Sequence, residues 1–168
     1  MTSSAVHPEK RVAPLNSQIV KMWVAASLWM ALIVLESSNL FSSEHTGHWL
    51  YPVFHFLTGV TALHFEVWNT YIRKTGHCVG YFVLSCLLFR AWKATLPRAT
   101  AWALRWAGIA LLMTAFVASM DEWHQTYLPS RTGSLHDVFL DSFAALVAQL
   151  VIMAWLRGRA ARGFAAAA

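Results

Sequence analysis

Residues Asp121–Asp141 read DEWHQTYLPSRTGSLHDVFLD, and this stretch separates two strongly apolar runs. It holds four acids, two histidines, a glutamine and an arginine, in a chain that is 57% hydrophobic and only 12% charged. Pro129 and Gly133 interrupt helix formation within it. The pattern therefore predicts two apolar helices joined by a polar turn. Ionisable groups at the end of a membrane helix are costly, so the turn is a candidate functional site.

Four runs that lack Asp, Glu, Lys and Arg predict four helices. Each run has 14 or 15 residues, which is fewer than the roughly 20 that a spanning helix usually needs. Lys and Arg at the ends can extend a run, because their aliphatic stems lie along the helix while their charges reach the headgroups. Four buried helices of a soluble bundle are the alternative. The runs are Met22–Leu35, Thr75–Phe89, Trp106–Met120 and Ser142–Leu156.

The placement of charge favours the membrane interpretation. If the four helices alternate in direction, ten of the thirteen Lys and Arg lie on one side, and only Glu9 of the eight acids joins them. The positive-inside rule then predicts that both termini are cytoplasmic. A soluble bundle has no reason to separate charge in this way. The ten residues are Lys10, Arg11, Lys21, Arg90, Lys93, Arg98, Arg105, Arg157, Arg159 and Arg162.

The expected fold is all-α: a polytopic membrane bundle of four transmembrane helices, with an interfacial or re-entrant segment between the first and the second. A chain of 168 residues has room for one domain. We expect a polar cytoplasmic tail over residues 1–17, a transmembrane domain over 18–157 and a cytoplasmic tail over 158–168. The net charge of +5 fits this topology and anionic lipid headgroups. No basic face interleaved with aromatic residues suggests nucleic-acid binding.

The segment from Phe41 to Arg73 is ambiguous. Thr46–Phe65 is a further charge-free run of 20 residues, but a fifth span there would place the cations of Arg90–Arg105 outside. We therefore expect one or two helices in the outer interface, anchored by aromatic residues. The four spanning helices are expected at about Gln18–Leu35, Lys74–Trp92, Thr100–Gln125 and Ser134–Leu156, the last capped by Ser134.

Helical spacing predicts that polar side chains from three helices converge at the outer face. Residues three or four positions apart lie on the same face of a helix. The second helix would contribute a face with Lys74, His77 and Tyr81. The third would contribute Glu122 and Gln125, the fourth Asp137 and Asp141, and the connecting turn Arg131.

These residues suggest chemistry on an anionic group. Catalytic candidates are His77, Glu122 and Asp137, with His77 and Glu122 as an acid–base pair because imidazole changes charge near neutral pH. Lys74 and Arg131 would hold the anion. The substrate-binding candidates are Lys74, Tyr81, Gln125, Arg131 and Asp141. Acids and a histidine can also bind a divalent cation, but their spacing matches no metal signature, so we assign no metal and no cofactor.

Simpler roles remain open for several of these residues. Ser134 and Asp137 have the spacing of a capping box, and Arg131 can pair with Glu122 or Asp137 to hold the turn. Lys74 can reach lipid headgroups, and Tyr81 can be an ordinary packed aromatic residue. His77 needs a partner, for which Glu122 is the best candidate. Two further histidines, His124 and His136, are expected to be solvated.

Two motifs resemble the VanZ-like family. The first is Arg-Lys-x-x-His-x-x-x-Tyr over Arg73–Tyr81. The second is Glu-x-x-Gln-x-x-x-Pro-x-Arg-x-Gly-Ser-x-x-Asp over Glu122–Asp137. The resemblance covers about residues 20–155. The chain departs from the family pattern at Asp141, where Asn is usual, and at Ala144–Ala145, where small glycine-rich positions are common.

This resemblance implies a role in the cell envelope, in the cytoplasmic membrane of a bacterium. The family is named for a protein of resistance to the glycopeptide antibiotic teicoplanin. The first expectation is a site that acts on or binds a lipid, a lipid-linked cell-wall precursor or a glycopeptide. The alternatives are a non-catalytic binding or structural protein, and a proton- or ion-handling site. Expected partners are membrane lipids and such a ligand, not nucleic acid; whether the protein is an enzyme stays open.

Overall fold

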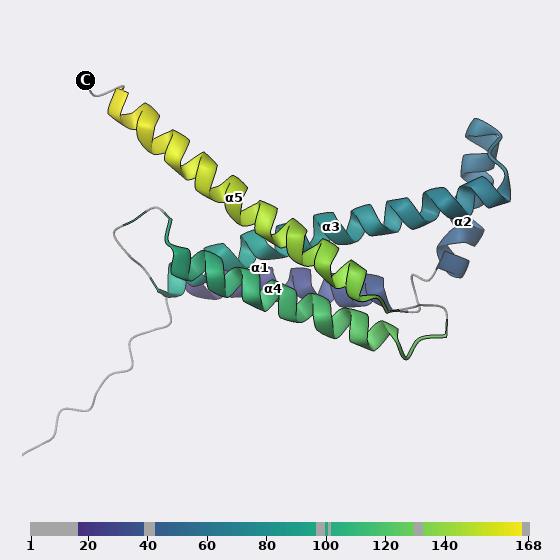
Figure 1. Ribbon diagram of the computed structural model, residues 1–168, viewed down its shortest axis with the longest axis horizontal. Coiled ribbons are helices and arrows are strands. Elements are labelled where there is room, and N and C mark those ends of the chain that lie inside the picture. The colour runs from purple at the N-terminus through teal and green to yellow at the C-terminus, as the bar shows by residue number, and fades with distance from the viewer. Residues whose placement is uncertain (1–16, 39–42, 97–99, 101, 130–132, 166–168) are drawn as a thin grey trace, which may run out of the picture.

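A computed structural model describes residues 17–38, 43–96, 100, 102–129 and 133–165. Within these ranges the protein has five helices and no strand, so the predicted all-α class is confirmed. The helices are α1 Ser17–Ser37, α2 Ser43–Thr58, α3 Ala62–Thr95, α4 Leu104–Gln125 and α5 Leu135–Ala165 (Figure 1).

Helix α3 is the central element of the bundle. It contacts each of the other four helices, whereas α2 contacts α3 alone among the described elements. In Figure 1, α3 and α5 cross, and the start of α3 continues beyond the crossing to meet α2. The second half of α3 therefore forms the core with α1, α4 and α5, while its first part projects from them.

The core combines a few large side chains with many small ones. Trp106, Tyr81 and Leu84 are fully buried, and alanines of α4 and α5 fill positions between them. Small residues let helix backbones approach closely, which is how helices pack when lipid surrounds them. The buried alanines of these two helices are Ala107, Ala110, Ala118, Ala145 and Ala148.

Two hydrogen bonds hold helix ends together at one end of the bundle. The indole of Trp23 on α1 donates to the Thr95 hydroxyl at the end of α3 (2.9 Å). The Trp106 indole, at the start of α4, donates to the carbonyl of Leu96 (2.8 Å). The end of α3 thus lies with the starts of α1 and α4, so successive core helices run in opposite directions.

The predicted start of the second core helix was wrong. The sequence suggested Lys74, but α3 begins at Ala62. Charge marks where a helix meets water or headgroups and does not by itself end a helix, so α3 passes through Arg73 and Lys74. The break between α2 and α3 lies earlier, at Gly59. Its φ of +69° is a conformation that glycine adopts more readily than other residues, and its N–H donates to the His55 carbonyl (2.8 Å).

Three helices are long and apolar enough to cross a membrane: α1, α4 and α5, the last over Leu135–Arg162. Helix α3 does not meet that criterion within the described chain, so four spans and a re-entrant segment are not confirmed. Large apolar side chains nevertheless cover the outside of the bundle. Examples are Leu28, Leu112, Phe116, Phe139 and Phe143, each more than 60% exposed. Such a surface favours a lipid environment over a soluble bundle.

A polar bridge joins α3 and α5 within the core. The Gln149 amide donates to the Ser85 hydroxyl (2.7 Å) and to the Ser85 carbonyl (3.1 Å). The Ser85 hydroxyl in turn donates to the carbonyl of Ala145 (3.1 Å). Ser85 and Gln149 are both buried, so water does not replace these bonds.

We expect Ser85→Ala to lower the free energy of unfolding by about 1 kcal/mol, the scale of hydrogen bonds between membrane helices. Ser119→Ala is the matched control, because among the described residues the Ser119 hydroxyl bonds only to a carbonyl of its own helix, that of Ala115 (2.8 Å). Unfolding of both variants in mixed micelles measures the difference. Equal stabilities would show that the bridge does not hold α3 to α5.

Candidate polar site at the helix ends

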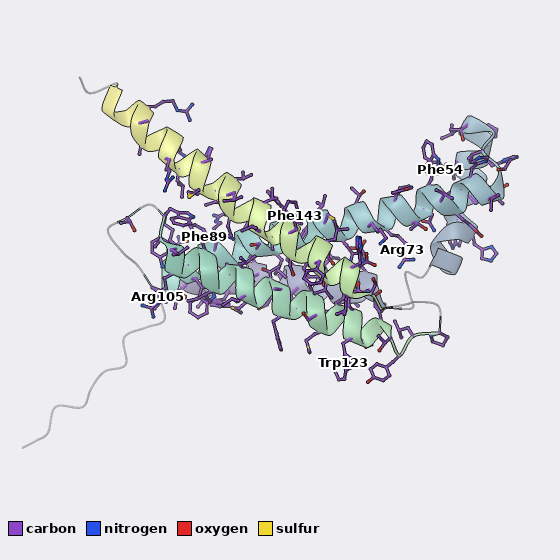
Figure 2. All side chains as sticks on the ribbon, in the orientation of Figure 1. Phe54, Arg73, Phe89, Arg105, Trp123 and Phe143 are labelled. Carbon is purple, nitrogen blue, oxygen red and sulfur yellow. The ribbon has the colours of Figure 1, made fainter. Side chains whose placement is uncertain are left out.

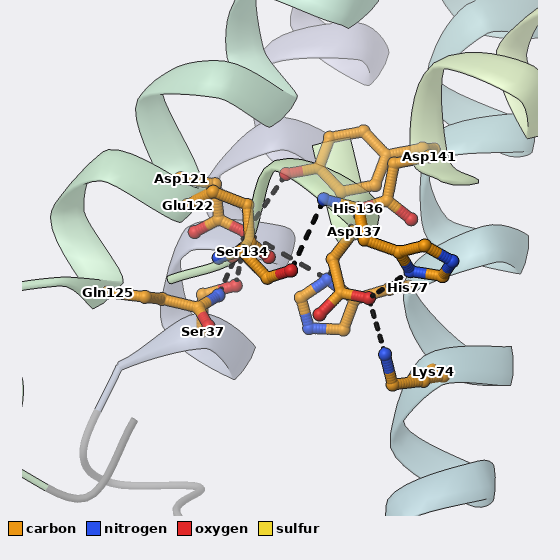
Figure 3. Close-up of polar contacts among 11 residues, drawn as sticks. Ser37, Lys74, His77, Asp121, Glu122, Gln125, Ser134, His136, Asp137 and Asp141 are labelled. Atoms are coloured by element: carbon orange, nitrogen blue, oxygen red, sulfur yellow. Dashed lines mark hydrogen bonds and ion pairs between the residues drawn. The ribbon is translucent and has the colours of Figure 1, made fainter. Parts of the chain in front are cut away.

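A polar cavity lies between α3, α4 and α5. Its volume is about 370 Å³. It forms where α4 ends and α5 begins, and α3 provides the opposite wall (Figures 1 and 3). The lining residues are Thr70, Arg73, Lys74, His77, Glu122, Gln125, Ser134, Asp137, Leu140 and Asp141.

Asp121 is a hydrogen-bonded hub behind the cavity wall. One carboxylate oxygen, Oδ2, accepts from the Ser37 hydroxyl (2.8 Å) and the Tyr81 hydroxyl (3.0 Å). The Gln125 amide donates to the same oxygen at 3.4 Å. These donors come from α1, α3 and α4, so this buried carboxylate connects three helices (Figure 3).

Glu122 fixes the start of α5. Its Oε2 accepts the backbone N–H of Ser134 (2.7 Å). The Ser134 hydroxyl accepts the backbone N–H of His136 (3.2 Å), so Ser134 caps α5 as the sequence predicted. Gly133 allows this close approach, because a Cβ there would lie 2.2 Å from the Glu122 carbonyl oxygen.

His77 lies among carboxylates of α4 and α5 (Figure 3). Its Nδ1 is 3.6 Å from Oδ2 of Asp141 and 3.9 Å from Oδ2 of Asp121. The sequence paired His77 with Glu122; the structure places Asp141 and Asp121 at ion-pair distance instead. Glu122 is still near, since His77, Glu122 and Asp141 each offer one atom within 4.8 Å of the other two.

Two cationic side chains of α3, Arg73 and Lys74, line the cavity. The ammonium of Lys74 pairs with Asp137, whose Oδ1 also lies 3.4 Å from Nδ1 of His136. Arg73 lines the cavity and a second hollow of about 580 Å³ between α2 and α3. Thr70 lines both as well, so the two hollows adjoin along α3.

Six of the eight predicted site residues line this cavity. Tyr81 is fully buried and bonds to Asp121 instead of lining it. Arg131 lies outside the described residues. His124 and His136 are exposed, as predicted. The six are Lys74, His77, Glu122, Gln125, Asp137 and Asp141.

A protein-family model described as VanZ/LLP1 matches residues 22–157. The chain belongs to the VanZ/LLP1 family. Both motifs that suggested this family fall inside the match. Seven of their residues line the one cavity: Arg73, Lys74, His77, Glu122, Gln125, Ser134 and Asp137. Among curated proteins and solved structures, no match was found.

Sequence reasoning missed three residues of this VanZ/LLP1 site. Asp121 is four positions before Gln125, so helical spacing already placed both on one face of α4. Arg73 was part of the first motif but received no role. Ser37 carried no signal, because its contact depends on how α1 packs against α4.

The site combines three chemical features. Buried carboxylates and an imidazole can exchange protons or hold a cation. The Arg73 and Lys74 cations can attract an anion. The polar walls border an apolar outer surface, so the site suits a ligand with one polar end.

We expect Gly133→Ala to destabilise the protein by about 1–3 kcal/mol, as overpacking usually does. The new Cβ would also lie 2.6 Å from Cγ2 of Thr126, so the Ser134–Glu122 bond would have to break. Gly108→Ala is the control, since no described atom beyond the adjacent residues and its own helix backbone lies within 4 Å of its Cβ position. Thermal unfolding in detergent tests both, and a neutral Gly133→Ala would contradict this close packing.

Proposed function

We propose that this membrane protein binds the anionic headgroup of an envelope lipid or lipid-linked cell-wall precursor and acts on it. The observation that carries the proposal is the cavity itself, where Arg73, Lys74 and His77 of α3 lie opposite Glu122 of α4 and Asp141 of α5. Its volume of about 370 Å³ lies in the range of small-molecule sites.

The surface of α5 supports an amphiphilic ligand. Asp137 and Asp141 line the cavity, while Phe139 and Phe143 are 74% and 62% exposed. These pairs are two positions apart, so α5 turns a polar face to the cavity and an apolar face to the opposite side. A headgroup in the cavity would leave its lipid chain in the bilayer that the apolar side of α5 faces.

The same proposal includes the membrane topology. The second half of α3 would be the fourth span, and α2 with the first part of α3 would lie in the outer interface. Arg73, near the cavity, and Arg105, at the start of α4, lie toward opposite ends of the bundle (Figure 2). With the basic end inside, both termini are cytoplasmic and the cavity faces outward, in the cytoplasmic membrane of a bacterium.

Within the cavity, His77 and Glu122 would exchange protons with the ligand, and Gln125 would orient it. Lys74 would share its charge between Asp137 and the anion. Arg131, which lies outside the described residues, would be a further cation for the anion, as its sequence motif suggests. Each role requires direct access to the headgroup, which lining the cavity gives to the four described residues.

A non-catalytic binder of teicoplanin-type glycopeptides is the second candidate. It is favoured by the satisfied contacts of the site, above all the three donors to Asp121, which suit a rigid binding surface. The two candidates differ in turnover. Mass spectrometry of a reconstituted lipid-linked substrate would show a product for an enzyme and an unchanged ligand for a binder.

We expect Arg73→Gln and Lys74→Gln each to weaken binding of a polyprenyl phosphate by about tenfold or more, because a charge-assisted contact is worth at least about 1.5 kcal/mol. Binding is measured in phosphatidylcholine nanodiscs. Arg105→Gln removes an exposed cation at the other end of the bundle and should leave binding unchanged. Equal loss in all three variants would mean that only overall charge matters and would overturn the proposal.

Where turnover is observed, Glu122→Gln should abolish it while the protein still folds. The amide keeps the shape of the side chain but cannot act as an acid or base. Size-exclusion chromatography and thermal unfolding check the fold. A fully active Glu122→Gln variant would remove Glu122 from the proton-transfer role. Cells with and without the gene, exposed to teicoplanin, test the resistance phenotype separately.

A further inference from the structure

The cavity contains more negative than positive charge. Of its described lining residues, three are carboxylates and two are permanently charged cations. Asp137 already pairs with Lys74, which leaves Glu122 and Asp141 near His77. Buried carboxylates are costly without compensating charge or donors, and they would repel an anionic headgroup. The cavity therefore needs a further positive charge for the proposed ligand.

The environment of Asp141 indicates where this additional positive charge would bind. Asp141 is only 1% exposed and lines the cavity. Neither of its oxygens accepts a hydrogen bond from any described residue, and the nearest cationic group, Nδ1 of His77, is 3.6 Å away. Asp121, by contrast, is held by three donors. The two buried carboxylates beside His77 therefore differ: Asp121 accepts hydrogen bonds from three donors, whereas both buried oxygens of Asp141 lack a donor among the described residues.

Three potential ligand atoms surround this position. His77 of α3, Glu122 of α4 and Asp141 of α5 each place one nitrogen or oxygen within 4.8 Å of the other two. Ligand atoms that bind one metal at about 2.0–2.2 Å lie closer to one another than 4.8 Å. The three side chains would therefore move slightly toward each other when the ion binds. Because each ligand comes from a different helix, sequence spacing gave no metal signature.

We propose that His77, Glu122 and Asp141 bind a divalent transition-metal ion, such as Zn²⁺ or Mn²⁺. Imidazole together with carboxylates favours these ions over Ca²⁺ and Mg²⁺, which prefer oxygen alone. Three protein ligands would leave a coordination position for water or another ligand, the arrangement typical of catalytic and not purely structural sites.

The metal site deepens the proposed function, and its role in ligand binding rests on that function. The bound ion would offer its open coordination position to an oxygen of the headgroup. Metal binding itself is measured without any lipid ligand. A failure of metal binding therefore leaves the polyprenyl phosphate experiment intact, and a failure of lipid binding leaves the metal site intact.

The first test measures metal stoichiometry and affinity. Purified protein in detergent is stripped with chelator and titrated with Zn²⁺ and with Mn²⁺ by calorimetry. We expect one ion per chain and a higher melting temperature with metal. Asp141→Asn and His77→Gln should each lower the affinity by more than about 100-fold, beyond the effect typical of residues outside the ligand shell.

Asp137→Asn is the matched control for this titration. It removes the same charge from the same helix and cavity, but from a carboxylate that pairs with Lys74. We expect its metal affinity to fall by less than about tenfold. Absence of stoichiometric binding to the native protein, or an equal loss in Asp137→Asn and Asp141→Asn, would overturn the site.

The second test reports direct ligation and does not depend on a loss of binding. Asp141→Cys offers a thiolate to Co²⁺, which should produce a near-ultraviolet thiolate-to-cobalt charge-transfer band. The native protein gives the baseline, because it already contains the free thiols of Cys78 and Cys86. Asp137→Cys should stay at that baseline. A band of equal strength in both variants, or in neither, would contradict ligation by residue 141.

Discussion

The buried carboxylate of Asp121 is the interaction on which the rest of the site depends. A charge this deep among apolar helices is stable only if donors surround it. Ser37, Tyr81 and Gln125 supply them from α1, α3 and α4. Satisfying one acid therefore requires three helices to meet at a fixed height, and it sets the distance between His77 and the acids of α4 and α5.

Two further contacts transmit this constraint to α5. The Glu122 carboxylate, next in sequence to Asp121, holds the backbone of Ser134, and the missing side chain of Gly133 allows the turn to pack onto α4. Both acids of α5 are then directed toward α3, where Asp137 pairs with Lys74 and Asp141 lies within ion-pair distance of His77. The turn is thus a structural part of the site as well as a connection.

Helical spacing was enough to predict which side chains share a face, and charge placement was enough to predict antiparallel core helices. Both arguments are local or additive along the chain. What the sequence did not provide depends on packing: the predicted partner of His77 was wrong, the choice between a binding and a packing role for Tyr81 stayed open, and Ser37 received no role. The prediction for the start of α3 was wrong for another reason: the sequence suggested that the helix begins at the cation of Lys74, whereas it begins at Ala62 and continues through Arg73 and Lys74.

The continuation of α3 beyond the cavity explains why the site is polar and yet protected. Helices α1 and α4 end at the level of the site and α5 begins there, so each exposes backbone groups and short polar side chains at that height (Figure 1). Helix α3 alone passes through, which gives the cavity one unbroken wall. Because α3 lines the polar cavity along part of its length and contacts α2 beyond the cavity, it cannot be uniformly apolar. The polarity that keeps α3 from qualifying as a clear membrane span is therefore a consequence of its place in the site.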